Sequence, residues 1–301
     1  MSDLPLDQLD QLEQLVQGRH WDPLAILGAH PMVQGSSPTV AIRCFLPEAD
    51  KVALLLSERG RQPVPMTRLH EAGLFEAIVP GPLGTAPYRL RVTDHAGQVS
   101  ERHDPYAFPP LLTDFELHLF AEGTFFKAYE TMGAHLRTVQ SIVGVHFVVW
   151  APNAARVSIV GDFNQWDGRR HPMTNRGATG LWELFIPELT DGTLYKYEIL
   201  SRHHEAPLLK ADPYAVASEL RPKTASIVRA LSPYRWKDQS WMTARAQQNP
   251  LASPLSIYEV HLGSWMRIPE EGDRWLTYSE LAAKLIPYVK NMGYTHVELL
   301  P

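Results

Sequence analysis

The sequence is poor in three features that would each indicate a particular class of protein: cysteine, long apolar runs and excess positive charge. Its single cysteine, Cys44, excludes an intrachain disulfide, and the apolar residues around it predict a buried structural thiol. No run approaches the ~18 apolar residues of a membrane span, and the acidic N-terminus lacks the basic segment of a signal peptide. The net charge of −5 gives no reason to expect nucleic acid or an anionic membrane as a partner. These absences predict a cytoplasmic protein.

Several catalytic signatures are also missing. No Cys/His spacing fits a zinc site, and there is neither a glycine-rich phosphate loop nor a G-x-S-x-G nucleophile elbow. No pair of carboxylates suited to acid–base chemistry stands out in the 301 residues. The residues themselves therefore predict no metal site and no catalytic group.

What the sequence does contain is an internal repeat. FLPEADKVALLL from Phe45 matches WAPNAARVSIVG from Trp150 at an offset of 105, and DPYAF from Asp104 matches DPYAV from Asp212 at 108. Between these, GLFEAIVPG and YRLRV match GLWELFIPE and YKYEI at 107, so the order is kept. Short β-like runs separated by turn residues are typical of antiparallel sandwiches. We predict two copies of one β-sandwich, immunoglobulin-like, at 33–110 and 140–225.

The remaining segments divide the chain further. Residues 1–32 should form an N-terminal helix (6–17) and a connection, 111–139 a connector, and 226–254 a linker. After Pro254 a buried-type strand (255–262), a helix with a Thr277/Glu280 capping box and a second strand (295–300) follow one another. This order predicts a βαβ unit over 255–301. The fold class is therefore mostly β, with two tandem antiparallel sandwiches before an α/β opening.

The loop VGDFNQWDGRRHPM (160–173) is where the two copies diverge most. Trp166 could stack on the apolar face of a sugar while Asn164 and Lys196 bind its hydroxyls. Alternatively, Phe163 and Trp166 plug the open end of the sandwich while Asp162 and Asn164 serve the turn. Residue types alone leave both interpretations open.

The strand near residue 260 offers a second candidate. Alternation puts Glu259 and His261 on one face, and Trp265 follows at the carboxyl end, where α/β enzymes build their sites. The alternative is that Glu259 and His261 form a hydrogen-bonded pair that ties adjacent strands.

HWDPLAILGAHP, the duplicated sandwich, GVHFVVWAPNAARVSIVGDFNQWDGRRHPM, YEVHLGSW and MGYTHVELLP together resemble the bacterial glycogen branching enzymes over essentially the whole chain. The resemblance implies that residues 255–301 open a (β/α)₈ barrel, truncated here. It implies cleavage of α-1,4-glucan and transfer to a 6-hydroxyl, making an α-1,6 branch by a retaining double displacement. It implies no metal and no cofactor, glycogen as partner and a monomer.

The resemblance also bears on the sites. It places the Asp nucleophile and the Glu acid/base beyond Pro301, so no catalytic residue is assigned and the 301 residues alone are predicted inactive. In related modules a loop Trp and a strand Lys contact sugar, which maps onto Trp166 and Lys196. A second stacking Trp of those modules has no match in SRHHEAPLLKADPY. Two alternatives stay open: a non-catalytic α-glucan-binding protein, and a sister α-amylase-type enzyme that debranches glucan or releases trehalose.

Overall fold

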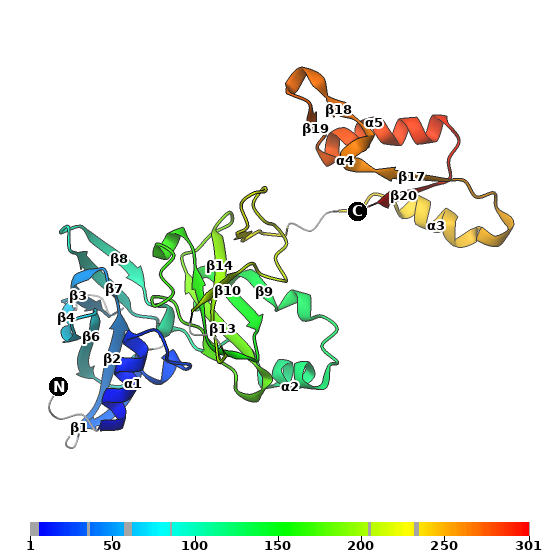
Figure 1. Ribbon diagram of the computed structural model, residues 1–301. Coiled ribbons are helices and arrows are strands. Elements are labelled where there is room, and N and C mark those ends of the chain that lie inside the picture. Colours follow the sequence, from blue (N-terminus) through cyan, green and yellow to red (C-terminus); the bar gives the residue numbers. More distant parts are fainter. Residues whose placement is uncertain are drawn as a thin grey trace. The chain divides into compact units, whose positions relative to one another are not determined.

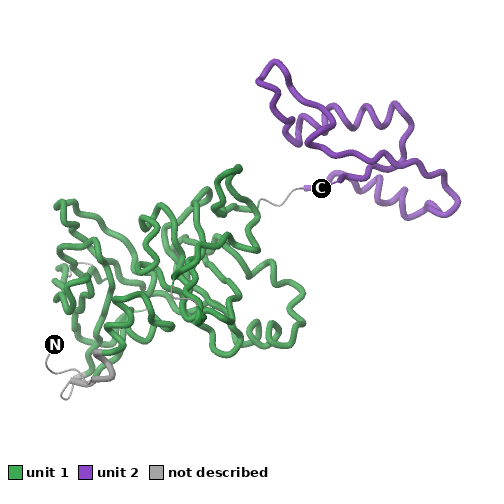
Figure 2. The backbone as a smooth tube through the Cα atoms, in the orientation of Figure 1, with its two compact units in different colours: residues 1–231 green, residues 232–301 purple. Residues whose placement is uncertain are grey.

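The computed structural model describes residues 6–34, 37–56, 62–84, 86–203, 206–231 and 235–300. The chain forms two compact units, residues 1–231 and 232–301, coloured separately in Figure 2. Unit 1 contains both predicted sandwiches, and unit 2 contains the predicted βαβ unit. The structure is mostly β with antiparallel sheets, as predicted.

The first module consists of two four-stranded sheets packed around one core. Their orders are β1-β2-β6-β5 and β4-β3-β7-β8. Cys44 lies in this core and is 2% exposed, which confirms the buried thiol. The strands, blue to cyan in Figure 1, are β1 (Gly28–Gln34), β2 (Ser37–Phe45), β3 (Ala49–Leu55), β4 (Val64–Pro65), β5 (Thr67–His70), β6 (Leu74–Pro80), β7 (Arg89–Asp94) and β8 (Val99–His103).

The second module repeats this plan with one sheet ordered β12-β13-β10-β9 and another ordered β11-β14-β15, with β16 also pairing with β14. Large buried aromatics such as Phe147, Trp182 and Tyr195 fill its core. Its strands are β9 (Gly133–Val139), β10 (Ile142–Trp150), β11 (Ala154–Val160), β12 (Thr174–Asn175), β13 (Leu181–Pro187), β14 (Leu194–Ser201), β15 (Leu208–Lys210) and β16 (Ser226–Ile227).

The strand register confirms the repeat. Phe45 lies opposite Leu74 in the first module, and their repeat mates Trp150 and Leu181 lie opposite each other in the second. A β-bulge follows the first residue of β3 and, in the same place, the first residue of β11. Both copies therefore fold on one template, including its irregularity.

A buried tyrosine–aspartate pair is repeated as well. Tyr88 donates to Asp104 at 2.6 Å, and Tyr195 donates to Asp212 at 2.6 Å. Both aspartates also accept a hydrogen bond from the backbone N–H two residues later. Each pair closes the end of its sandwich in the same way.

The paired strands begin earlier in the chain than the predicted module starts at 33 and 140. Strands β1 and β9 open with Gly28 and Gly133, both at positive φ, and each has a histidine two residues later. His30 and His135 each bind the carbonyl three residues before, at 3.0 and 2.9 Å. His30 and Pro31 interrupt the apolar alternation in β1, and β9 carries polar His135 and Arg137 among its apolar residues, so neither segment has the alternation that predicts a strand.

The N-terminal helix α1 (Leu6–Val16) forms as predicted. Its Leu15 and Val16 are buried together with Ile26 and Leu27 in the core cluster that includes the second module. The helical spacing of Leu6, Leu9, Leu12 and Val16 predicts the apolar face of this helix: Leu12 also packs against this core, whereas the side chains of Leu6 and Leu9 lie outside the described residues. The short helical turn η1 (Pro23–Ala25) follows.

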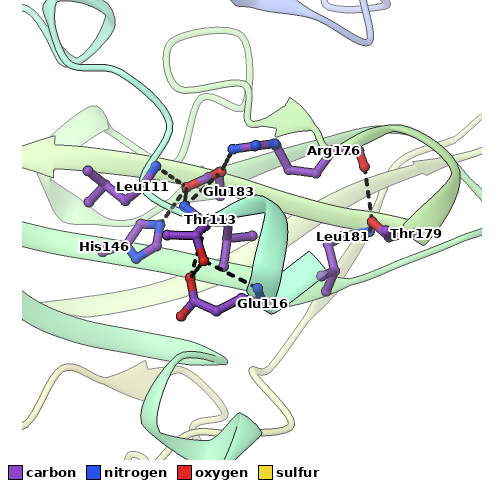
Figure 3. A network of polar contacts seen from close by, with 9 residues as sticks. Leu111, Thr113, Glu116, His146, Arg176, Thr179, Leu181 and Glu183 are labelled. Atoms are coloured by element: carbon purple, nitrogen blue, oxygen red, sulfur yellow. Dashed lines mark hydrogen bonds and ion pairs between the residues drawn. The ribbon is translucent and has the colours of Figure 1, made fainter. Parts of the chain in front are cut away.

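The segment between the modules is fixed by one buried carboxylate, drawn in Figure 3. Glu183 of β13 accepts hydrogen bonds from the backbone N–H of Leu111 at 2.7 Å and of Leu112 at 3.0 Å. It also binds His146 Nε2 at 2.8 Å and the Arg176 guanidinium. Helix α2 (Asp114–Glu122) then begins with a Thr113/Glu116 capping box. Glu183 therefore holds the start of the connector against the sheet.

In unit 2, β17 (Ile257–His261) and β20 (His296–Leu300) pair in parallel, and α5 (Tyr278–Asn291) connects them. The βαβ unit is thus present, with the predicted Thr277/Glu280 cap and Gly293 at positive φ. Its assignment to a barrel stays a prediction. The other elements of this unit are α3 (Gln239–Gln247), α4 (Leu262–Trp265), β18 (Arg267–Ile268) and β19 (Arg274–Trp275). Among the described residues, no helix is both long and apolar enough to cross a membrane.

Candidate functional site

The loop between β11 and β12 is held onto the outer face of the β11–β14 pair by a buried arginine. Arg156, 4% exposed, binds Ser158, the Gly168 carbonyl at 2.7 Å and Glu198 at 2.6 Å. A side chain at Gly168 would collide with Glu198, since a Cβ there would lie 1.9 Å from a carboxylate oxygen. Any larger residue at 168 would therefore require the Glu198 carboxylate to move away from its contact with Arg156.

Asn164 has no exposed surface. Its Oδ1 accepts from Gly161 N at 3.0 Å, and its Nδ2 donates to Ile159 O at 2.8 Å and to His171 Nδ1 at 2.9 Å. Burial, and then the charges of Arg170 and Arg102, lower the pKa of His171 to about 3, so its ring stays neutral and can accept. The amide of Asn164 thus serves the turn, the second of the two roles that its sequence allows.

Trp166 sits at the end of this turn in an unusual backbone conformation. Gln165 and Trp166 both have positive φ, 59° and 60°, in the left-handed region that non-glycine residues rarely adopt. The indole is partly exposed, and its Nε1 donates to Asp162 at 2.8 Å. A non-glycine residue keeps this backbone conformation only where the surrounding structure fixes it. Such residues are found most often at ligand-binding and active sites.

Lys196 lies beside the start of this loop. It is on β14 directly opposite Val160, the last residue of β11, and its Nζ donates to Thr224 at 2.6 Å. The structure therefore brings Trp166 and Lys196 to the same end of the β11–β14 pair, and Asn164 is buried in the turn that leads from β11 to Trp166.

The candidates in unit 2 divide into two groups. Glu259 and His261 are exposed on one face of β17, whereas Val260 is buried against α5, as the predicted alternation requires. Trp265 turns toward the helix, where its Nε1 donates to the Tyr258 hydroxyl at 3.1 Å and its ring packs near Tyr288. Trp265 therefore does not share a site with Glu259 and His261. His261 instead binds Ser264 at 3.0 Å.

Sequence reasoning missed the Arg156–Glu198 pair that anchors the loop. One signal was available. Arg156 and Ser158 alternate with core residues on β11, so they occupy the face on which the loop must lie. Within the described ranges no group of three or more His, Cys, Asp or Glu side chains could hold a metal ion.

Residues 131–215 match the family model of carbohydrate-binding module 48, also described as the isoamylase N-terminal domain, so the second module is of the carbohydrate-binding class. Residues 8–106 match the model of the N-terminal domain of the alpha-1,4-glucan branching enzyme GlgB. The chain therefore carries the N-terminal domains of the GlgB branching-enzyme family.

Curated relatives extend this likeness along the chain. The 1,4-alpha-glucan branching enzyme GlgB of Gloeobacter violaceus is 51% identical over 99% of the chain, and that of Thermosynechococcus vestitus is 47% identical over 97%. The chain spans about two fifths, 40%, of the length of each. Among solved structures, a pullulanase of Anoxybacillus sp. LM18-11 complexed with maltotriose aligns with 91% of this chain and 39% of its own at 19% identity. Its TM-score of 0.40 is too low to support a conclusion.

Proposed function

We propose that this chain forms the glucan-binding N-terminal part of a 1,4-α-glucan branching enzyme. The observation that carries the proposal is the order of the two family matches, GlgB N-terminal domain and then carbohydrate-binding module 48, within relatives 47–51% identical. In the complete enzyme an α-1,4-glucan is cleaved and the released segment is transferred to a 6-hydroxyl.

The mechanism in this proposal is a double displacement at two carboxyl groups. An Asp attacks the anomeric carbon as a Glu protonates the leaving oxygen. The Glu then deprotonates the incoming 6-hydroxyl, which displaces the Asp. Both groups belong, in this proposal, to barrel strands that follow β20, and the β17–α5–β20 unit of residues 257–300 is the start of that barrel. Cytoplasmic location, a monomer and independence from metal or cofactor are parts of the same proposal.

The 301 residues alone should leave the iodine colour of amylose unchanged, because neither catalytic carboxyl is assigned to them. New α-1,6 linkages, measured by debranching and chain-length analysis after long incubation, would contradict this placement of the chemistry. Buffer with amylose alone supplies the baseline.

Glucan binding by the second module is proposed to depend on Trp166 and Lys196. The strained turn presents the indole, whose apolar face suits the C–H face of a glucose ring, while the ammonium of Lys196 can donate to a hydroxyl. Asn164 contributes by holding the turn.

Trp166→Ala should weaken binding of maltoheptaose roughly tenfold, because a large aromatic contact is removed. Isothermal titration calorimetry on the 301-residue chain measures this. Trp275→Ala, which removes an exposed indole of unit 2, is the matched control and should bind like the wild type. An unchanged affinity together with an unchanged number of bound maltoheptaose molecules, in a folded Trp166→Ala variant, would assign the indole to structure.

A further inference from the structure

A groove lies between Trp21, in the segment after α1, and the second module, away from the Trp166 loop. It has a volume of about 370 Å³, within the usual range of small-ligand sites. It opens where β11 starts, whereas the Trp166 loop follows the residue where β11 ends. Strand β11 has seven residues, so roughly 20 Å separates the two places. The groove is lined in part by Trp21, Ala154, Ala155, Asn175, Trp182 and Arg202.

One wall of the groove is an exposed indole on a fixed segment. Trp21 is 55% exposed, although it lies between α1 and η1, whose flanking residues are buried in the core of unit 1. The ring of His20, itself 5% exposed, lies nearly parallel to the indole, with 4° between the planes and 6.5 Å between the centroids. His20 Nδ1 accepts from Asp22 N at 3.1 Å, which fixes the turn. Trp21 is therefore a large exposed aromatic whose position is set by its neighbours.

Two other lining residues, Asn175 and Arg202, supply hydrogen-bonding groups. Asn175 belongs to β12, and Arg202 follows β14, where its backbone N–H donates to Asn153 O at 3.1 Å. Within the part of the chain that the structure describes, neither side chain has a hydrogen-bond or ion-pair partner, so the amide and the guanidinium are free to bind a ligand. Both groups can donate, and the amide can also accept.

The other lining residues are small or buried. Ala154 and Ala155 contribute only methyl groups, and Trp182 is 1% exposed with its Nε1 donating to Ala151 O at 3.0 Å. Among the described residues that line the groove there is no carboxylate, and the exposed Arg202 is the one charged group. The groove thus combines an aromatic surface, uncharged alanine residues and side-chain donors that can hydrogen-bond to hydroxyl groups. This combination suits an uncharged polyhydroxyl ligand better than an anion.

We propose that this groove is a second glucan-binding site, in which Trp21 stacks on a glucose unit and Asn175 and Arg202 bind its hydroxyls. The identity of the ligand rests on the proposed function, whereas the site itself rests on the groove. Two sites about 20 Å apart within unit 1 allow a long glucan to occupy both at once, which raises its apparent affinity through effective concentration. A short maltooligosaccharide fills each site independently.

Calorimetric titration with maltotriose tests the site. The wild-type chain should bind two molecules, Trp21→Ala and Trp166→Ala one each, and the double variant none. Affinity electrophoresis in amylose should show a loss of retardation of roughly tenfold for Trp21→Ala, because the advantage of double occupancy disappears. Arg202→Ala, a change at an exposed residue, should weaken the second site several-fold without disturbing the fold, as judged by thermal unfolding.

The outcomes separate this inference from the proposed function. One site that Trp166→Ala removes, and that Trp21→Ala and Arg202→Ala leave unchanged, would overturn the second site while the proposed function stands. No binding of maltotriose or amylose by the wild type would overturn both. Trp275→Ala is again the matched control, because it also removes an exposed indole. This variant should still bind two molecules of maltotriose.

Discussion

Replacement of Glu183 by alanine is expected to lower the melting temperature of unit 1 by roughly 6–20 °C. The side chain is 2% exposed and accepts from His146, Arg176 and two backbone N–H groups. Its removal leaves several buried donors without an acceptor, which costs about 3–5 kcal/mol. In a unit of this size each kcal/mol shifts the melting temperature by about 2–4 °C. Differential scanning calorimetry measures the shift.

The repeat supplies a matched control. Glu76 is the repeat mate of Glu183 at an offset of 107. Its carboxylate instead accepts a hydrogen bond from the Arg43 guanidinium at 2.8 Å, and both side chains are nearly a fifth exposed. We expect Glu76→Ala to cost about 1 kcal/mol or less. Equal losses in the two variants would show that Glu183 has no special part in holding the connector.

Low pH should weaken the stabilisation that the Glu183 carboxylate provides. Burial alone would raise the pKa of Glu183, but the hydrogen bonds from His146, Leu111 and Leu112 outweigh it and the pKa lies below its usual value. A lowered pKa means that the stabilisation is present above the pKa of the unfolded chain. It is lost as the pH falls through the folded value. The stability gap between wild type and Glu183→Ala should therefore narrow in acid.

Unit 1 should also lose about 3 kcal/mol of stability from Asp104 as the pH rises from about 4 to about 6. Burial raises the pKa of this carboxyl from its usual 3.8 to about 6, although Tyr88 and the Tyr106 N–H donate to it. With the folded pKa raised, the contribution is complete below the unfolded pKa and disappears as the pH passes the folded one. A rise from 3.8 to about 6 corresponds to about 3 kcal/mol.

Urea unfolding between pH 4 and 7 measures this effect as the difference between wild type and Asp104→Asn. The amide cannot ionise, so the variant should show a flatter pH profile. Asp212→Asn is the matched change in the second module, where burial likewise raises the pKa of the carboxyl. A pH slope unchanged by Asp104→Asn would mean that this carboxyl ionises in the folded state as readily as in the unfolded chain.

The features that could be predicted from the sequence are those that depend on a local pattern of residues. The repeat was visible because Phe45 and Trp150 start the same motif, and the structure gives both the same register. Strands β1 and β9 were not predicted. His30 and Pro31 interrupt the apolar alternation of β1, and the sequence of β9 has no clear alternation of its own. The cap at Thr277 was predictable because both of its partners lie within four residues.

What the sequence could not provide was the direction of side chains in irregular segments. Asn164 and Trp166 are two residues apart, yet one is fully buried and the other partly exposed, because the turn reverses its direction at positive φ. Trp265 likewise follows a strand end but folds back in α4 onto Tyr258. The Arg156–Glu198 pair joins residues 42 positions apart, a distance that no local pattern spans.

The strained turn at Gln165 and Trp166 has a consequence for the entropy of binding. A free loop would lose conformational freedom on meeting a ligand, at about 1–2 kcal/mol for each backbone residue fixed. Here the left-handed pair is already held by the buried amide of Asn164 and by the Arg156 anchor beneath the loop. That ordering is completed when the chain folds, so a ligand meets a surface with little freedom left to lose. The free energy of a stacking contact on this indole would therefore contribute to the measured affinity with almost no deduction for ordering the loop.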